Sequence, residues 1–270
     1  MELTRHLTST GPRWACDNFF LPADVDLSML LTLPRDKMLA RLDALVTDEP
    51  VQGLQLAPVD STQEIWAAGV TYMRSREARR AESSVAGVYD KIYDAKRPEL
   101  FFKSLGWRAV GSGAVARIRH DSRWNVPEPE LVLVINHMLE IVGYCAGNDL
   151  SSRDIEGENP LYLPQAKVYD GSCALGPAIY LATAEELTQL PIHLQVVRGG
   201  ETIFEGETNV SQMKRKLPEL AAYLGLELDF PNGVLLMTGT GIVPGEEFSL
   251  QIGDQVFIQV GEAYLVNEIS

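Results

Sequence analysis

Two glutamates and an aspartate have the spacing of a possible metal site. Glu128 and Glu130 lie two residues apart, so both side chains project from one face if the chain is extended there. The run at 131–135 is continuously apolar, which predicts a strand buried on both faces. Two carboxylates at the start of such a strand repel each other and lose their solvation unless a cation or shared protons compensate. A hard divalent ion such as Mg2+, Mn2+ or Ca2+ takes oxygen ligands of this kind.

A third carboxylate is needed, because most Glu-x-Glu pairs are solvated surface charges. Asp149 follows a second apolar stretch, 141–145. A short turn at 136–139 would pair the two strands antiparallel and return Asp149 to the level of the two glutamates. Residues 151–154 read Ser-Ser-Arg-Asp, so Asp149 could instead be a helix cap.

Strands dominate the elements that must position these carboxylates. Apolar runs predict strands at 130–135, 140–144, 178–181, 193–197, 202–204 and 255–260. Helical spacing of apolar residues predicts helices at 35–46 and about 213–224. The predicted class is therefore α+β with sheet dominating. Turn-forming residues near 58–62 favour a boundary there, with a small N-terminal domain at 1–60 and a catalytic domain at 61–270.

Composition narrows the possible partners. The formal net charge is −14, and the 23 Lys and Arg residues form no basic stripe, which argues against nucleic acid as a partner. No apolar run approaches the ~18 residues that a membrane span requires. The three cysteines show no paired spacing, so we expect a cytoplasmic location without membrane contact. An acidic protein that binds an organic acid needs a local positive centre, which a metal ion would supply.

Several motifs, in matching order over about residues 98–245, resemble the fumarylacetoacetate hydrolase family. They are Glu128-Pro129-Glu130-Leu131, Gly143-Tyr144-Cys145-Ala146-Gly147-Asn148-Asp149-Leu150-Ser151-Ser152-Arg153-Asp154, Gln165-Ala166-Lys167, Ser172-Cys173-Ala174-Leu175-Gly176-Pro177 and Thr238-Gly239-Thr240. The resemblance implies a mixed β-sandwich roll in which Glu128, Glu130 and Asp149 hold a divalent ion, usually magnesium. It also implies a small-molecule 2-oxo acid or diketo acid as substrate, and assembly into a homodimer or homotetramer.

Longer strings are similar to the sugar-acid dehydratases of that family, which convert 2-keto-3-deoxy-pentonates such as 2-keto-3-deoxy-D-arabinonate to 2,5-dioxopentanoate. The strings are residues 93–103, 121–124 and 158–167. This likeness implies that Glu99 and Lys167 are the acid and the base, in an order that the sequence leaves open. A metal ion would polarise the 2-oxo group of the substrate, and the two side chains would remove the C3 proton and protonate the leaving C4 hydroxyl.

The same resemblance suggests the residues that hold the substrate. They are Lys103, Arg153, Thr238, Gly239 and Thr240. Without the resemblance, Lys167 would be read as a surface lysine and Glu99 as an ion-pair partner of Lys103 or Arg97. The Thr-Gly-Thr run could equally be an ordinary turn, although its amides and hydroxyls suit an anionic carboxylate.

The polar segment 71–97 is predicted to be a lid that orders over bound substrate. Hydrolases and decarboxylases of the family carry a water-activating histidine in this lid, and Ser75 stands at that position here. The missing histidine favours dehydration. Two alternatives remain: a hydrolase or decarboxylase that acts on a C–C bond of a diketo acid, and a non-catalytic protein that binds a 2-oxo acid.

Overall fold

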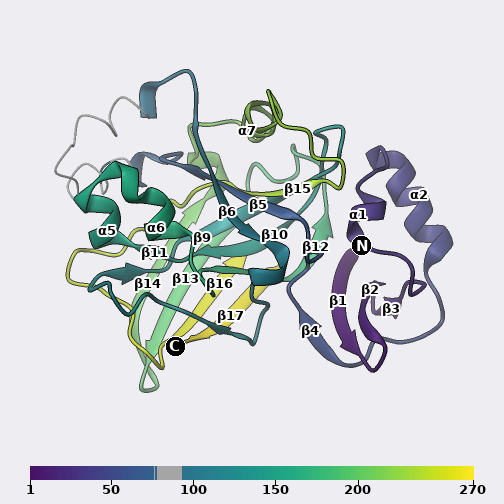
Figure 1. The fold of residues 1–270 in the computed structure, drawn as a ribbon, viewed down its shortest axis with the longest axis horizontal. Helices are drawn as coiled ribbons and strands as arrows, with labels where there is room; N and C mark the ends of the chain where they lie inside the picture. The colour runs from purple at the N-terminus through teal and green to yellow at the C-terminus, as the bar shows by residue number, and fades with distance from the viewer. Residues whose placement is uncertain (76, 78–92) are drawn as a thin grey trace.

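A ten-stranded mixed sheet forms the frame of the molecule. The computed structural model describes residues 1–75, 77 and 93–270. The main path of the sheet runs in the order β3-β2-β1-β12-β10-β9-β15-β5-β6, and β4 pairs with β1 (Figure 1). Its strands are β1 (Glu2–Thr8), β2 (Gly11–Cys16), β3 (Phe19–Phe20), β4 (Leu54–Leu56), β5 (Glu64–Gly69), β6 (Glu99–Leu105), β9 (Pro129–Ile135), β10 (Ile141–Asp149), β12 (Cys173–Leu181) and β15 (Val234–Met237).

A second sheet of five strands packs against the first and makes a sandwich. Its order is β14-β13-β16-β17-β7. The strands are β7 (Val115–Ala116), β13 (Pro191–Arg198), β14 (Glu201–Asn209), β16 (Gln255–Val260) and β17 (Ala263–Ile269). A short pair, β8 (Asn125–Val126) with β11 (Ser151–Ser152), lies beside the sandwich. The sheet-dominated α+β class predicted from the sequence is confirmed.

The helices are short and lie around the sheets. Those whose bounds fall within the described residues are α1 (Leu27–Leu30), α2 (Arg35–Leu45), α5 (Arg153–Glu158), α6 (Leu163–Lys167) and α7 (Leu217–Leu224), with 3-10 turns η1 (Gly106–Arg108), η2 (Pro160–Tyr162) and η3 (Val210–Gln212). The helix predicted at 213–224 begins four residues late. Pro218 lies in the first turn of this helix. Proline is tolerated there but would break a helix that began a full turn earlier. None of the helices in the described ranges is long and apolar enough to cross a membrane.

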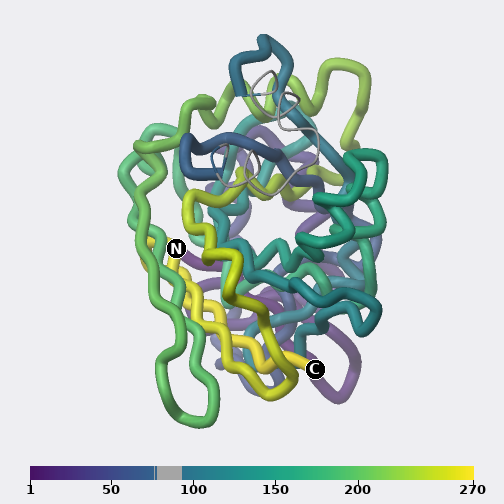
Figure 2. The backbone as a smooth tube through the Cα atoms, turned by 90° about the vertical axis from the view of Figure 1, so that its left-hand side faces the viewer, coloured from purple at the N-terminus to yellow at the C-terminus, as the bar shows by residue number. Residues whose placement is uncertain are grey.

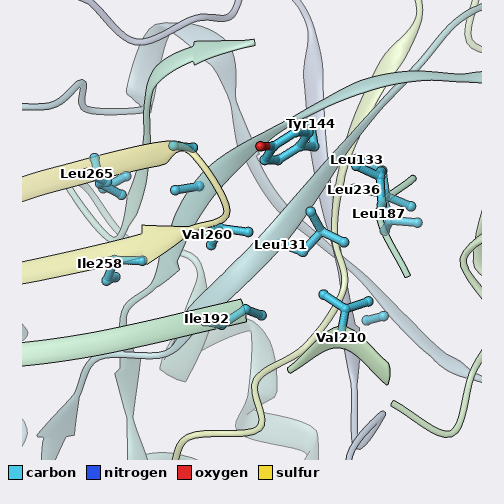
Figure 3. Packing of buried hydrophobic residues seen from close by; sticks show 14 of the residues in the cluster. Leu131, Leu133, Tyr144, Leu187, Ile192, Val210, Leu236, Ile258, Val260 and Leu265 are labelled. Atoms are coloured by element: carbon cyan, nitrogen blue, oxygen red, sulfur yellow. The ribbon is translucent and has the colours of Figure 1, made fainter. Parts of the chain in front are cut away.

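Strand β9 lies between two hydrophobic cores, as its apolar run predicted. Leu131, Leu133 and Ile135 lie in one core with residues of the five-stranded sheet such as Ile192, Ile258 and Leu265, and Figure 3 shows part of this core. Val132 and Val134 point the other way, into a core shared with the N-terminal helices α1 and α2. Each of these side chains is fully buried, and burying one contributes about 1.5–3 kcal/mol. The strand that leads from the two glutamates is thus fixed from both sides.

The predicted hairpin places the three carboxylates together. In the β9–β10 ladder Gly147 pairs with Glu130 and Asn148 with Pro129, and the Asp149 amide donates to the Glu128 carbonyl at 2.9 Å. Asp149 is the last residue of β10, and Ser152 is the residue that precedes helix α5. The alternative reading of Asp149 as a helix cap is therefore wrong.

Residues 1–60 join the main sheet and also form a layer beside it. Strand β1 pairs antiparallel with β12, and Figure 2 shows these purple N-terminal segments behind the green and yellow strands of the second sheet. The boundary at residue 60 stays a prediction. Within the N-terminal part, Asp60 ties β2 to α1, because its carboxylate accepts hydrogen bonds from the Trp14 indole at 2.8 Å and from the Ser28 amide at 2.7 Å.

Replacing Asp60 with alanine should lower the free energy of unfolding by about 2–3 kcal/mol, because two N–H groups lose their acceptor. Urea unfolding followed by tryptophan fluorescence measures the change. Asp24→Ala removes an exposed carboxylate from the same segment and should stay within about 0.5 kcal/mol of wild type. Equal losses in the two variants would contradict this role for Asp60.

Candidate active site

Three buried carboxylates meet at the end of the β9–β10 hairpin. One oxygen each from Glu128, Glu130 and Asp149 lie within 4.8 Å of one another, and the residues are only 3%, 1% and 1% exposed. Burial, and then repulsion from Asp149 and Glu128, raises the pKa of Glu130 well above its ordinary value. The charged triad is therefore costly unless a cation sits beside it.

The donor set suits a hard divalent ion. Carboxylates only accept, so three converging ones leave lone pairs that a metal ion can fill. The adjoining cavity encloses about 300 Å³ that no atom fills, including the solvent at its mouth. These observations show that the triad could bind a metal ion.

Three buried cations surround the triad. Lys167 Nζ donates to Glu128 Oε2 at 2.6 Å and to Asp149 Oδ2 at 2.8 Å. Lys103 Nζ lies 2.5 Å from Asp149 Oδ1, and Arg153 Nη2 donates to Glu128 Oε1 at 2.7 Å. Such charge-assisted contacts in a dry setting are strong, and they offset part of the cost of burying the carboxylates.

These cations come from three separate elements. Lys103 belongs to β6, and its ammonium also donates to the Leu150 and Lys167 carbonyls, at 3.2 and 2.5 Å. Arg153 is the first residue of α5, and Lys167 is the last residue of α6. The Lys103 contacts therefore tie the end of α6 to the end of β10, which fixes the position of Lys167.

A cavity opens on one side of the triad. It is lined by Ala68, Gly69, Val70, Ser75, Glu99, Phe101, Glu128, Asp149, Glu156, Leu163, Lys167, Gly239 and Thr240. Glu99, the first residue of β6, is opposite Gly69 of β5, and a β-carbon at Gly69 would overlap the Glu99 carboxylate. The glycine therefore leaves the space that Glu99 occupies.

The chain leaves β5 through a strained residue. Val70 has a φ of +52°, a left-handed conformation that costs a β-branched residue about 1–3 kcal/mol. The bend lets Thr71 Oγ1 donate to the Thr238 carbonyl at 2.7 Å. Strain of this size at a cavity wall is typical of a functional segment.

The Thr-Gly-Thr run contacts the triad through its backbone. The Gly239 amide donates to Glu130 Oε2 at 2.6 Å, and Gly239 has a φ of +90° that suits glycine. Gly239 and Thr240 line the cavity. Thr238 Oγ1 instead donates to the Leu131 carbonyl at 2.9 Å.

The predicted site residues thus fall into two groups. Glu99, Lys167, Gly239 and Thr240 lie at the cavity with members of the triad. In the described part of the chain, Lys103, Arg153 and Thr238 do not line this cavity, and the two cations contact triad members instead. Substrate binding by these residues stays a prediction.

The lid prediction falls mostly outside the described residues, because residues 76 and 78–92 are not among them. Ser75 is described. It is 5% exposed, lines the cavity and donates to the Tyr72 carbonyl at 2.8 Å.

Glu156 is a site residue that the sequence analysis missed. It lies in α5, is 3% exposed and lines the cavity beside Glu99, Lys167 and Leu163. A signal was present, because residues three apart share a helix face and Glu156 is three residues after Arg153. The helix has only six residues, too few for periodicity to reveal it.

A two-sheet α+β fold with a buried acidic triad able to bind a metal ion defines the class of protein. The family model for the fumarylacetoacetate (FAA) hydrolase C-terminal region matches residues 64–269. The chain belongs to the fumarylacetoacetate hydrolase family.

Two curated relatives carry dehydratase names. The chain is 43% identical over 278 residues to a Haloferax volcanii protein named "Probable 2-keto-3-deoxyxylonate dehydratase", a match that covers 98% of this chain and 96% of that protein. It is 44% identical over 211 residues to the 2-dehydro-3-deoxy-D-arabinonate dehydratase of Saccharolobus solfataricus, covering 75% of this chain and 70% of that one.

A solved structure gives a similar result. The fold matches that of a 2-keto-3-deoxy-D-arabinonate dehydratase complexed with magnesium and 2,5-dioxopentanoate, with a TM-score of 0.83 and 34% identity. The match covers 100% of this chain and 99% of that chain.

Replacing Glu130 with glutamine should stabilise the metal-free protein and weaken metal binding. Because the folded protein holds the Glu130 proton more tightly than the unfolded chain does, the metal-free protein loses stability as the pH rises above the ordinary glutamate pKa. The amide removes that loss at neutral pH and can still accept the Gly239 N–H.

Unfolding in the presence of a chelator measures the first effect, and calorimetric titration with Mg2+ or Mn2+ measures the second, with at least a ~10-fold loss of affinity expected. Glu268→Gln, an exposed change in β17, is the control and should alter neither quantity. A metal-free Glu130→Gln protein less stable than wild type would contradict the repulsion described here.

Proposed function

We propose that this chain is a divalent-metal-dependent dehydratase that converts a 2-keto-3-deoxy-pentonate, such as 2-keto-3-deoxy-D-arabinonate, to 2,5-dioxopentanoate. The observation that carries the proposal is that Glu99 and Lys167 line one cavity with Glu128 and Asp149. An acid and a base beside a metal site are what elimination of water next to a ketone requires. The dehydratase names of the two relatives and the ligands of the similar solved structure support the same substrate class.

Mg2+ is the proposed ion, held by Glu128, Glu130 and Asp149, and Mn2+ or Ca2+ would fit the same oxygen ligands. When bound, it would attract the carboxylate and the 2-oxo oxygen of the substrate and make the C3 hydrogens more acidic.

Lys167 suits removal of the C3 proton. Its Nζ donates hydrogen bonds to Glu128 and Asp149 of the triad. It is therefore close to the metal ligands, where the 2-oxo acid group would bind. A cation at the triad competes for the same oxygens and would leave Nζ available to the substrate. Glu99, on a different wall against Gly69, is then the acid that protonates the departing C4 hydroxyl.

The environment of Ser75 supports dehydration over hydrolysis. A serine hydroxyl that donates to a backbone carbonyl cannot replace an imidazole as the base that activates water. His6, His120, His137 and His193 are all outside the described lining of the cavity. Binding of substrate by Lys103, Arg153, Thr238, Gly239 and Thr240, homodimeric or homotetrameric assembly, and a cytoplasmic location remain parts of the proposal.

Lys167→Met and Glu99→Gln should each lower turnover of a 2-keto-3-deoxy-pentonate at least ~100-fold, because each removes one proton-transferring group. Product formation is followed as 2,5-dioxopentanoate by NMR, with Mg2+ affinity measured in parallel. Glu99→Gln should keep the wild-type affinity, and Lys167→Met should bind the ion at least as tightly, since a competing ammonium is gone.

Lys37→Met, an exposed change in α2, is the matched control and should keep full turnover. Wild-type activity in both Lys167→Met and Glu99→Gln would refute these roles. A wild-type protein that cleaved acylpyruvates and left every keto-deoxy acid unchanged would refute the reaction itself.

A further inference from the structure

The proposed reaction needs proton transfers beyond removal of the C3 proton and protonation of the C4 hydroxyl. The substrate has a methylene at C3, a hydroxyl at C4 and a primary alcohol at C5. Removal of the C3 proton and departure of the C4 hydroxyl give 5-hydroxy-2-oxopent-3-enoate, whose C5 is still an alcohol. The product has an aldehyde at C5 and methylenes at C3 and C4.

The second half of the reaction is therefore an isomerisation. A C5 hydrogen leaves as a proton, and its electron pair forms the C4–C5 double bond while the C3–C4 pair shifts toward C2 and the 2-oxo oxygen. Protonation at C3 restores the ketone and leaves an enol at C4 and C5. The enol hydroxyl then loses its proton and C4 gains one, so atoms and electrons balance without an oxidant.

The base for C5 must lie away from the triad. If C1 and C2 bind at the metal site, C5 is three carbon–carbon bonds of about 1.5 Å each beyond C2. Within the described lining of the cavity, the ionisable side chains that are not triad members are Glu99, Glu156 and Lys167. Lys167 is placed at the triad by its contacts with Glu128 and Asp149, and Glu99 is assigned to the C4 hydroxyl.

Glu156 meets the remaining requirements. Helix α5 carries it into the cavity beside Leu163 of α6, a wall formed by neither the hairpin nor β6. Its side chain is 3% exposed. A buried carboxylate in the cavity wall disfavours a substrate whose C5 end is apolar and favours one whose C5 bears a hydroxyl.

We propose that Glu156 is the base that removes the C5 proton and so converts the enone intermediate to 2,5-dioxopentanoate. The inference rests on the proposed function. It assigns two bases to the cavity, with Lys167 acting at C3 and Glu156 acting at C5. A keto acid whose C5 bears no hydroxyl could lose water in this cavity but could not yield an aldehyde.

The test supplies the enone itself, chemically prepared 5-hydroxy-2-oxopent-3-enoate, to the Mg2+-loaded protein. Wild type should convert it to 2,5-dioxopentanoate, and Glu156→Gln should do so at least ~100-fold more slowly. With the 2-keto-3-deoxy-pentonate as substrate, Glu156→Gln should still release water within ~10-fold of the wild-type rate, so that the enone accumulates and is seen by its ultraviolet absorbance. Glu158→Gln, an exposed change in the same helix, should behave as wild type in both assays.

A second variant keeps the test valid if Glu156→Gln does not fold. Glu156→Asp retains the carboxylate but draws it back by one methylene, so the C5 step should slow and the isotope effect from deuterium at C5 should exceed that of wild type. Magnesium affinity should not change in either variant.

Isomerisation of the enone by Glu156→Gln at the wild-type rate, equal slowing of water loss and aldehyde formation, or an unchanged isotope effect in Glu156→Asp would each overturn the assignment. Failure of wild type to dehydrate any keto-deoxy acid would overturn the proposed function as well. That failure is measured on the wild-type protein alone, so it is distinguished from failure of the Glu156 assignment.

Discussion

Mutual repulsion among three buried carboxylates is the constraint on which this structure depends. Glu128, Glu130 and Asp149 are each at most 3% exposed, and one oxygen from each lies within 4.8 Å of the other two. Their desolvation costs several kcal/mol per charge before any compensation. The chain supplies part of that compensation through Lys103, Lys167 and Arg153, which together contact the four carboxylate oxygens of Glu128 and Asp149. A divalent ion would supply the rest, which explains why such a triad persists in a protein interior.

The fold holds these groups in place by packing β9 from both sides. The side chains of β9 alternate between the core shared with the second sheet and the core shared with α1 and α2, so a one-residue slip would move each set into the core shaped for the other. The hairpin to β10 then fixes Asp149 opposite Glu128. The cations arrive from β6, α5 and α6, which are separate from the hairpin. The hairpin therefore fixes the acidic triad independently of the cavity walls that β5, β6, α5 and α6 supply.

Local patterns made the triad predictable from the sequence. The two-residue spacing of Glu128 and Glu130, the apolar runs and the short turn are all properties of neighbouring residues, and the structure confirms the hairpin that they predict. The family and the dehydratase likeness were carried by long strings of residues rather than by geometry. The comparisons with known proteins agree with that interpretation.

Contacts between distant segments could not be predicted in the same way. Lys103 reaches Asp149 although β9, β15 and β5 lie between β6 and β10 in the sheet, and no local pattern encodes that neighbourhood. Glu156 is in a helix too short to show a period. The predicted helix started too early because Met213 continues the apolar spacing of α7 toward the N-terminus. In the structure α7 begins at Leu217, with Pro218 in its first turn.

A crystal soaked in Mn2+ tests the central claim most directly, since the anomalous signal of manganese marks the ion without reference to activity. The account predicts one strong peak bounded by the carboxylate oxygens of Glu128, Glu130 and Asp149, at oxygen distances of about 2.0–2.4 Å, with the Lys167 ammonium displaced from the oxygens that the ion takes. A peak elsewhere in the molecule, or an undisturbed Lys167 bridge between Glu128 and Asp149 at saturating Mn2+, would contradict it.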